Sequence, residues 1–249
     1  MIKIQRQADS FRFSKKFDVI VVGGGHAGAE AAFITAKAGL NVLLITMNLD
    51  TIGQMSCNPS IGGVAKGHIV REIDALGGLM GKVIDKTGIH FKMLNRSRGP
   101  AVWGPRAQAD KKKYQHLVKW YLEQMPKLSI IQDSVSSLLI ENQQVYGVRT
   151  GRNFEYLSDV VILTTGTFLR GKIHVGDFTH KAGRFGDKSE EFLSLSLADL
   201  GFETGRLKTG TPPRLHADTI DFERLTLQEP DNHPQPLAFY TNTKEKHRG

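Results

Sequence analysis

Three glycines at GxGxxG spacing are the residues of this sequence best suited to bind a phosphate-bearing ligand. Gly23, Gly25 and Gly28 directly follow the apolar run 19–22. In this pattern the first glycine permits a tight turn, the second lets the backbone approach a pyrophosphate, and the third lets the next helix pack on the sheet. Free amide groups at the start of that helix attract the anion. We therefore predict a dinucleotide site here rather than an ordinary glycine turn.

Cys57 is the side chain best suited to covalent or acid–base chemistry. It is the only cysteine of the chain and lies between a serine and an Asn-Pro pair in a glycine-rich stretch. A lone cysteine can also be a small buried hydrophobic residue. Its polar neighbours favour a reactive thiol, because a thiolate near a helix start or a basic group is a competent nucleophile or acid. Lys66, His68 and Arg71 are candidate basic partners.

The glycine pattern requires a strand before it and a helix and a strand after it, and the sequence predicts all three. The apolar run 19–22 is typical of a parallel strand that is covered on both faces. An alanine-rich helix is expected at 26–38, ending at Gly39, and a second buried strand at 41–46. The predicted fold class is α/β, Rossmann-like, with a parallel central sheet and inserted antiparallel strands.

The end of the second strand leaves the identity of the dinucleotide open. NAD and FAD sites usually carry Asp or Glu there to hold the ribose. This sequence has Thr46, Met47 and Asn48 instead, and Asp50 lies too far along. Thr46 and Asn48 could bond to the ribose hydroxyls. NADP is not favoured, because no Arg stands in that turn.

Further strands are expected between 128 and 149, followed by a buried strand at 159–165 that runs into Gly166. A hairpin series inserted before a buried strand is a common arrangement in flavoproteins. The strand that begins at Val135 would pass an adenine. We expect the last strand to return beside the first, so that the glycine turn and Gly166 grip one nucleotide.

The remaining segments are less regular. The stretch 47–104 has too many glycines for a plain helix, so we expect loops with a short helix at about 68–76. Another helix is expected at 190–200, after an irregular stretch. The predicted domains are an N-terminal extension (1–16), a cofactor-binding domain (17–225) with an inserted substrate region at about 47–106, and an irregular end (226–249).

Most of the excess positive charge lies in the segment 95–119. The formal net charge of +8 favours a polyanionic partner, although many basic enzymes bind no nucleic acid. Arginines in a loop punctuated by Gly and Pro suit phosphate contacts, and Trp103 among them could stack a base or pack on its own loop. The lysines begin an amphipathic helix with an apolar stripe from Tyr114 to Met125, and by default they form a solvated face. The candidate nucleic-acid contacts are Arg96, Arg98, Arg106, Lys111, Lys112 and Lys113.

Several classes of protein are disfavoured by composition. No run approaches eighteen apolar residues, so no membrane span is expected. The residues before Phe17 lack the apolar region of a secretory signal, although a short organellar leader stays open. A single cysteine excludes internal disulfides and cysteine zinc sites and fits a reducing cytosol. The histidines lack metal-ligand spacing, so we expect no metal and a cytoplasmic location.

Five ordered motifs together resemble one family. They are GGGHAGAEAA, DTIGQMSCNPSIGGVAKGHIVREIDALGGLMGK, RGPAVWGPRAQADKKKY, LTTGTFLRGKIHVG and GRLKTGTPPR. They span Asp18 to about Asp221 and resemble the glucose-inhibited division protein A family, the flavoproteins of tRNA uridine 5-carboxymethylaminomethyl modification. The resemblance implies bound FAD, NADH as reductant, methylenetetrahydrofolate as one-carbon donor, and glycine or ammonium. It also implies wobble-uridine tRNA as substrate, a GTPase partner (MnmE) and a homodimer of the full-length protein.

The resemblance also assigns residues. Cys57 falls on a cysteine that the family is thought to use in catalysis, and a further FAD contact, often Ser, falls at Glu190 beside Ser189. A partner cysteine, an NAD-associated segment and a helical GTPase-docking domain would lie beyond Gly249, so the chain covers under half of a usual member. The expected cofactor contacts are Gly23, Gly24, Gly25, His26, Ala27, Gly28, Thr46, Val135, Gly166, Ser189 and Glu190.

Two alternatives remain beside this prediction. The folate- and FAD-dependent tRNA uridine methyltransferases share the flavin fold but make 5-methyluridine, and the Cys57 loop and KTGTPPR argue against them. The other alternative is a truncated, catalytically silent fragment that binds flavin or tRNA weakly.

Overall fold

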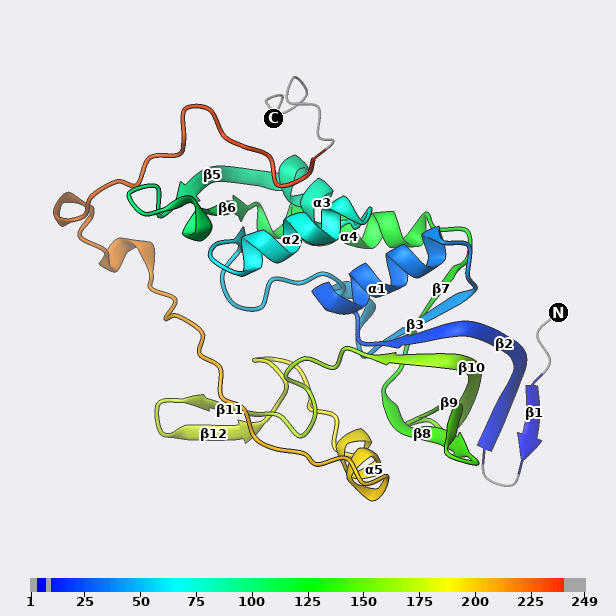
Figure 1. The fold of residues 1–249 in the computed structure, drawn as a ribbon. Coiled ribbons are helices and arrows are strands. Elements are labelled where there is room, and N and C mark those ends of the chain that lie inside the picture. Colours follow the sequence, from blue (N-terminus) through cyan, green and yellow to red (C-terminus); the bar gives the residue numbers. More distant parts are fainter. Residues whose placement is uncertain (1–3, 8–9, 240–249) are drawn as a thin grey trace. The chain divides into compact units, whose positions relative to one another are not determined.

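A computed structural model describes residues 4–7 and 10–239 of the chain (Figure 1). These residues form two compact units. Unit 1 consists of Met1–Gln54 and Val118–Arg206, and unit 2 consists of Met55–Leu117 and Leu207–Gly249. The predicted domain bounds, 17–225 with an insertion at about 47–106, stay a prediction. The two segments of unit 2 do show that residues distant in sequence complete one compact body.

Unit 1 is built on a seven-stranded sheet in the order β7-β3-β2-β10-β9-β8, with β1 paired to β2. The pairs β2–β3, β3–β7 and β2–β10 are parallel, and the remaining pairs are antiparallel. The strands are β1 (Ile4–Gln7), β2 (Ser10–Val22), β3 (Val42–Thr46), β7 (Leu128–Gln132), β8 (Val135–Glu141), β9 (Gln144–Thr150) and β10 (Phe154–Leu163). The predicted α/β class, with a parallel centre and added antiparallel strands, is confirmed.

The centre of this sheet is buried because its strands are apolar on both faces. Every residue of β3 is buried, as are Val19–Val22 at the end of β2. Helix α1 (His26–Lys37) lies against the parallel strands, and its small residues Ala29, Ala32 and Ala36 let it approach closely. The helix is followed by Gly39, whose φ of 93° is the left-handed conformation predicted for its end.

The outer parts of unit 1 differ from prediction in three places. Strand β2 begins at Ser10 rather than near Asp18, because Phe11 and Phe13 alternate with polar residues and pack on Phe154 of β10. Strand β7, grouped with the hairpin strands by sequence, instead extends the parallel sheet beside β3. The stretch after β10, expected to be irregular, contains a hairpin, β11 (Lys172–Val175) and β12 (Phe178–Lys181).

Helix α5 (Leu193–Asp199) is shorter than the predicted helix 190–200. Glu190 is outside the helix because its backbone bridges to Leu169: its amide donates to the Phe168 carbonyl at 2.8 Å, and its carbonyl accepts the Arg170 amide at 2.7 Å. The side chain of Glu190 instead accepts the amide of Phe192, the residue before the helix, at 3.0 Å.

Unit 2 contains a three-stranded antiparallel sheet in the order β4-β6-β5, with helices packed against it. The strands are β4 (Ser60–Gly62), β5 (Gly88–Leu94) and β6 (Gly104–Ala109), and the helices are α2 (Lys66–Ala75) and α3 (Met80–Thr87). The short helix predicted at about 68–76 is α2. The loops predicted around it at 47–104 were wrong in part, because they contain α3 and the strands β4 and β5.

The amphipathic helix predicted after residue 110 is α4 (Lys111–Glu123), and Tyr114, Val118 and Leu122 on its apolar stripe are buried. Its residues up to Leu117 belong to unit 2 and the others to unit 1. Single 3-10 turns occur at Leu49–Thr51, Pro100–Val102, Ala217–Thr219 and Phe222–Arg224.

Candidate functional site

The turn between β2 and α1 has the geometry that a pyrophosphate requires. Gly23 has a φ of 107°, which favours glycine, and a Cβ at Gly28 would lie 1.8 Å from the carbonyl oxygen of Gly23. Only glycine therefore lets α1 start so close to the turn. At Gly25, which precedes the helix, no atom lies within 4 Å of an added Cβ, and no side chain caps the helix start. Open space thus adjoins the start of α1, where the helix dipole places a partial positive charge.

The end of β10 lies beside this turn, as the sequence predicted. Leu163 pairs with Val22, the amide of Thr164 donates to the carbonyl of Val22 at 2.8 Å, and the Thr164 hydroxyl lies 3.1 Å from the carbonyl oxygen of Gly23. Gly166 follows, with a φ of 56° and no atom within 4 Å of an added Cβ. Both glycine segments therefore leave room at the carboxyl ends of neighbouring parallel strands, where α/β folds bind ligands.

A cavity of about 400 Å³ opens next to the ends of β3 and β7. Ser189 and Glu190, two of the predicted cofactor contacts, line it, and Thr46 and Val135 are each next in sequence to a lining residue. The lining residues are Met47, Asp133, Ser134, Gly151, Arg152, Ser189, Glu190, Glu191 and Phe192. The cavity therefore adjoins four of the predicted cofactor contacts.

The acidic side chains of the 189–191 segment are already engaged. Glu190 bonds to the Phe192 amide, and the Ser189 hydroxyl donates to Glu191. That hydrogen bond is the main reason that the pKa of Glu191 is lowered from its ordinary value. Ser189 and Glu190 thus shape one wall of the cavity through local bonds.

Sequence reasoning missed Asp133 and Arg152, whose side chains line the cavity with a separation of 3.8 Å between Arg152 Nε and Asp133 Oδ1. Asp133 directly follows an apolar strand, which is the position of chemistry-bearing residues in parallel sheets. The signal was present, but it depended on assigning β7 to the parallel sheet.

In unit 2, Cys57 is exposed, and its Sγ lies 3.8 Å from the carbonyl oxygen of Gly210. The structure therefore brings together the cysteine loop and the KTGTPPR segment, which are more than a hundred residues apart in sequence. The thiol of one loop thus contacts the backbone of the other.

Lys66, one of the three candidate basic partners, interacts electrostatically with Cys57. Burial lowers the pKa of Lys66, and the charge of Cys57 partly offsets this effect. The ammonium also donates to the carbonyl of Ser60 at 3.2 Å. His68 instead accepts the amide of Ala65 at 3.2 Å, and Arg71 lies over the ring of Phe239 at 4.6 Å.

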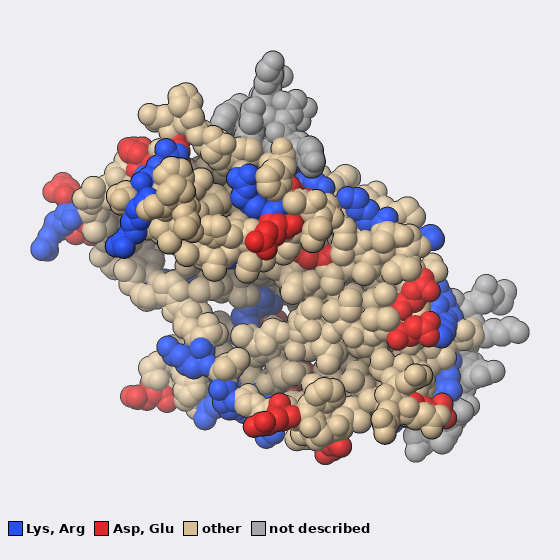
Figure 2. All heavy atoms as spheres, viewed as in Figure 1, with Lys and Arg blue, Asp and Glu red and all other residues tan. Residues whose placement is uncertain are grey.

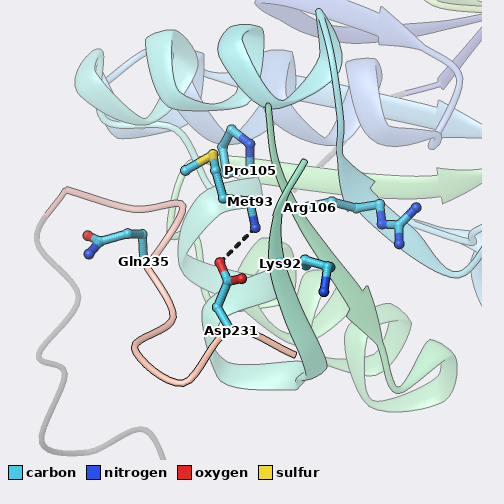
Figure 3. A pocket seen from close by; sticks show the side chains of 6 residues that line it. All are labelled: Lys92, Met93, Pro105, Arg106, Asp231 and Gln235. Carbon is cyan, nitrogen blue, oxygen red and sulfur yellow. Dashed lines mark hydrogen bonds between the residues drawn. The ribbon is translucent and has the colours of Figure 1, made fainter. Parts of the chain in front are cut away.

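Two of the candidate nucleic-acid contacts are held by the segment 228–231 of unit 2. Arg96 pairs with Asp231 at 2.9 Å, and Arg106 donates to the Gln228 side chain at 2.9 Å. Figure 3 shows the pocket where this segment meets β5 and β6: the Asp231 carboxylate accepts the amide of Met93, near Lys92 and Arg106. Arg106 lies in strand β6, so its predicted loop position was wrong.

The other candidate contacts lie around α4 and the loop before it. Trp103 donates its indole N–H to the carbonyl of Arg98 at 2.9 Å, so it packs on its own loop. The Asp110 carboxylate accepts the amides of Lys112 and Lys113, each at 3.1 Å. It therefore caps the helix start and places a negative charge beside the lysines there. On the face in Figure 2, Lys and Arg lie in separate groups with Asp and Glu between them.

Two further features are absent from the described part of the chain. No group of three or more His, Cys, Asp or Glu side chains could hold a metal ion. Among the same residues, no helix is long and apolar enough to cross a bilayer.

Comparison with known proteins identifies the family. A model described as glucose inhibited division protein A matches residues 18–248. The chain belongs to this family. Two similar proteins are each named tRNA uridine 5-carboxymethylaminomethyl modification enzyme MnmG. The one from Protochlamydia amoebophila is 55% identical over 95% of the chain, and the one from Geotalea uraniireducens is 54% identical over 92% of it.

The fold agrees with that of a solved member of the glucose inhibited division protein A family. The structure of Aquifex aeolicus GidA matches 91% of the chain with a TM-score of 0.87 and 51% identity. The chain spans 40% and 37% of the length of the two curated relatives and 38% of the Aquifex chain. What the whole proteins do is therefore considered below as a proposal.

Proposed function

We propose that this chain is the FAD-binding part of an enzyme that adds a carboxymethylaminomethyl group to position five of a tRNA wobble uridine. Family membership supports the reaction class, since relatives more than half identical are named as tRNA uridine 5-carboxymethylaminomethyl modification enzymes. The observation that carries the proposal is the open glycine turn, with the end of β10 beside it and the cavity beyond β3 and β7.

The residues of this turn suit a dinucleotide. The pyrophosphate would approach Gly25 and the first amides of α1, with Gly23, Gly24, His26, Ala27 and Gly28 shaping the loop. Thr46, Val135, Ser189 and Glu190 would surround the adenosine, and Gly166 would leave room under the rest of the cofactor. When bound, FAD would supply hydride chemistry, with NADH as reductant and methylenetetrahydrofolate as carbon donor.

Cys57 is the proposed catalytic residue, assisting addition to the uridine ring or proton transfer at it. A thiolate that adds to a pyrimidine activates the ring carbon that receives the new group. The ammonium of Lys66 is close enough to interact electrostatically with Cys57. An exposed thiol is accessible to a large substrate such as tRNA.

The tRNA backbone would be bound by Arg96, Arg98, Arg106, Lys111, Lys112 and Lys113. Arg96 and Arg106 would have to exchange Asp231 and Gln228 for phosphates. The hydrogen bonds of Arg98 among the described residues use its backbone and leave its guanidinium available. A GTPase partner (MnmE), a homodimer and a cytoplasmic location are part of the same proposal and rest on the family resemblance.

Replacement of Gly25 by Asp tests the flavin site. Its backbone, with φ of −72° and ψ of −171°, accepts any residue, and Asp is a favourable residue before a helix. The fold should therefore be kept, while a carboxylate now occupies the place of the pyrophosphate. We expect flavin fluorescence titration to show FAD binding by the wild-type chain and a loss of at least about 100-fold in affinity for the variant, since a buried like-charge contact costs several kcal/mol.

Gly99→Asp is the matched control, because Gly99 also precedes a helical turn, has an ordinary φ of −64° and has open space around it. It should bind FAD like the wild-type chain. A Gly25→Asp variant that binds FAD normally would contradict the proposed site, and a wild-type chain that binds no FAD would favour a silent fragment. Nucleoside analysis of treated tRNA distinguishes 5-methyluridine, the product of the methyltransferase alternative.

A further inference from the structure

The strand that normally supplies a ribose-binding acid does not supply one here. In dinucleotide-binding folds that acid stands at the end of the second parallel strand. Strand β3 ends at Thr46 and is followed by Met47. The next parallel strand, β7, is followed by Asp133, whose amide donates to the carbonyl of Thr46 at 2.9 Å. An acidic residue therefore stands one strand away from the usual position.

Asp133 is buried, yet half of its carboxylate lacks a donor. Only 8% of the residue is exposed. Oδ1 accepts the amide of Ser134 at 2.8 Å and lies 3.8 Å from Nε of Arg152. Oδ2 makes no hydrogen bond within the described residues. Because this oxygen has no donor among the described residues, it is available to accept a hydrogen bond from a ligand hydroxyl.

The cavity provides the route for that hydroxyl. Asp133 and Arg152 line it together with Met47, the residue that directly follows β3. Its volume of about 400 Å³ is in the range of small-ligand sites, and it opens at the carboxyl ends of β3 and β7. A nucleotide whose pyrophosphate lies at Gly25 would extend its adenosine in this direction.

We propose that Asp133 accepts hydrogen bonds from the 2′- and 3′-hydroxyls of the adenosine ribose, in place of the acid missing from β3. Arg152 is a positioning residue that holds Oδ1 and leaves Oδ2 to the ligand. The inference rests on the proposed dinucleotide site and adds to it the group that recognises the ribose.

The first test compares two flavins. FAD carries the adenosine and FMN lacks it, so Asp133→Asn should weaken FAD about 10-fold, the value of one charge-assisted hydrogen bond, and leave FMN unchanged. The control is Asp159→Asn, which removes an exposed carboxylate paired with Lys16. The dissociation constants are measured by quenching of flavin fluorescence. Unchanged FAD affinity, or an equal loss for FMN, overturns the inference.

The second test needs only the wild-type chain, so it does not depend on how the variant folds. ADP and 2′,3′-dideoxy-ADP are compared as competitors of FAD, and we expect the dideoxy compound to compete about 10-fold less well. Equal competition overturns the role of Asp133 while leaving the flavin site intact. Absence of FAD binding in the wild-type chain overturns the proposed function and this inference together.

Discussion

Arg12 and Glu155 form an ion pair across the parallel strands β2 and β10, with 2.8 Å between Arg12 Nη2 and Glu155 Oε2. Only 2% of the Glu155 side chain is exposed, and Arg149 of β9 binds its other oxygen at 2.7 Å. One buried carboxylate thus joins the parallel part of the sheet to its antiparallel part.

Glu155→Gln should lower the free energy of unfolding by about 1–3 kcal/mol at pH 7, the range for hydrogen bonds to charged groups. Burial alone would raise the pKa of Glu155, but the hydrogen bonds from Arg149 and Arg12 outweigh it, so the pKa is lowered. Because the folded-state pKa is lowered, the ionised carboxylate stabilises the fold at pH values above the ordinary glutamate pKa. This stabilisation is lost as the pH falls through the folded-state pKa. Urea unfolding between pH 7 and pH 3 should therefore show the two proteins converging at acidic pH. A constant difference would contradict this.

Asp85→Ala should loosen the segment 228–239 of unit 2. The buried Asp85 carboxylate accepts the amides of Leu237 and Ala238 at 2.9 and 3.0 Å. Removing it leaves two buried donors unpaired, at about 1–3 kcal/mol each. Limited proteolysis should cut near residues 228–239 faster than in wild type. Asp218→Asn, an exposed carboxylate, serves as control, and equal cleavage of all three proteins would disprove the role of Asp85.

Lys66→Met should slow alkylation of Cys57 by iodoacetamide at pH 7. Lys66 interacts electrostatically with Cys57, and a charge pair of this kind is worth about 0.2–1 kcal/mol, or roughly up to a fivefold change in rate. Mass spectrometry follows the reaction at the single cysteine. Lys16→Met, in unit 1, should react at the wild-type rate. An unchanged rate for Lys66→Met would show that its charge does not reach the thiol.

Binding of tRNA should weaken steeply as salt is added, because phosphate contacts release counterions. Arg98→Ala should reduce the slope of log K against log[salt] by about 1, the value for one phosphate contact. Lys16→Ala is a control, since that lysine is exposed and pairs with Asp159 of unit 1. Filter binding from 50 to 300 mM salt measures both slopes. If Arg98→Ala keeps the wild-type slope, Arg98 does not meet phosphate.

The parallel core could be predicted from sequence because its signals are local. The apolar run ending at Val22, the glycines that follow and the strand ending at Thr46 each have one physical interpretation. The partner strand β10 could be found in the same way, because it is apolar and runs into Gly166.

The sheet of unit 2 could not be predicted, because pairing across long separations stabilises it. Arg106 lies in β6 between two strands that contribute Gly62 and Lys92 as its cross-strand neighbours. The segment itself is rich in Gly and Pro and predicts a loop. The contacts of Arg106 with Gln228 and of Arg96 with Asp231 likewise could not be predicted, because they join residues more than a hundred positions apart.

The division of unit 2 into two stretches of sequence has a consequence for synthesis on the ribosome. The strands of the sheet described for unit 1 have all been translated by Arg206, whereas the hydrogen bonds from the backbone of residues 237–239 to Asp74 and Asp85 can form only once those residues have been made. The nascent chain can thus pair the strands of this sheet before the backbone of residues 237–239 is available to the unit that contains Cys57.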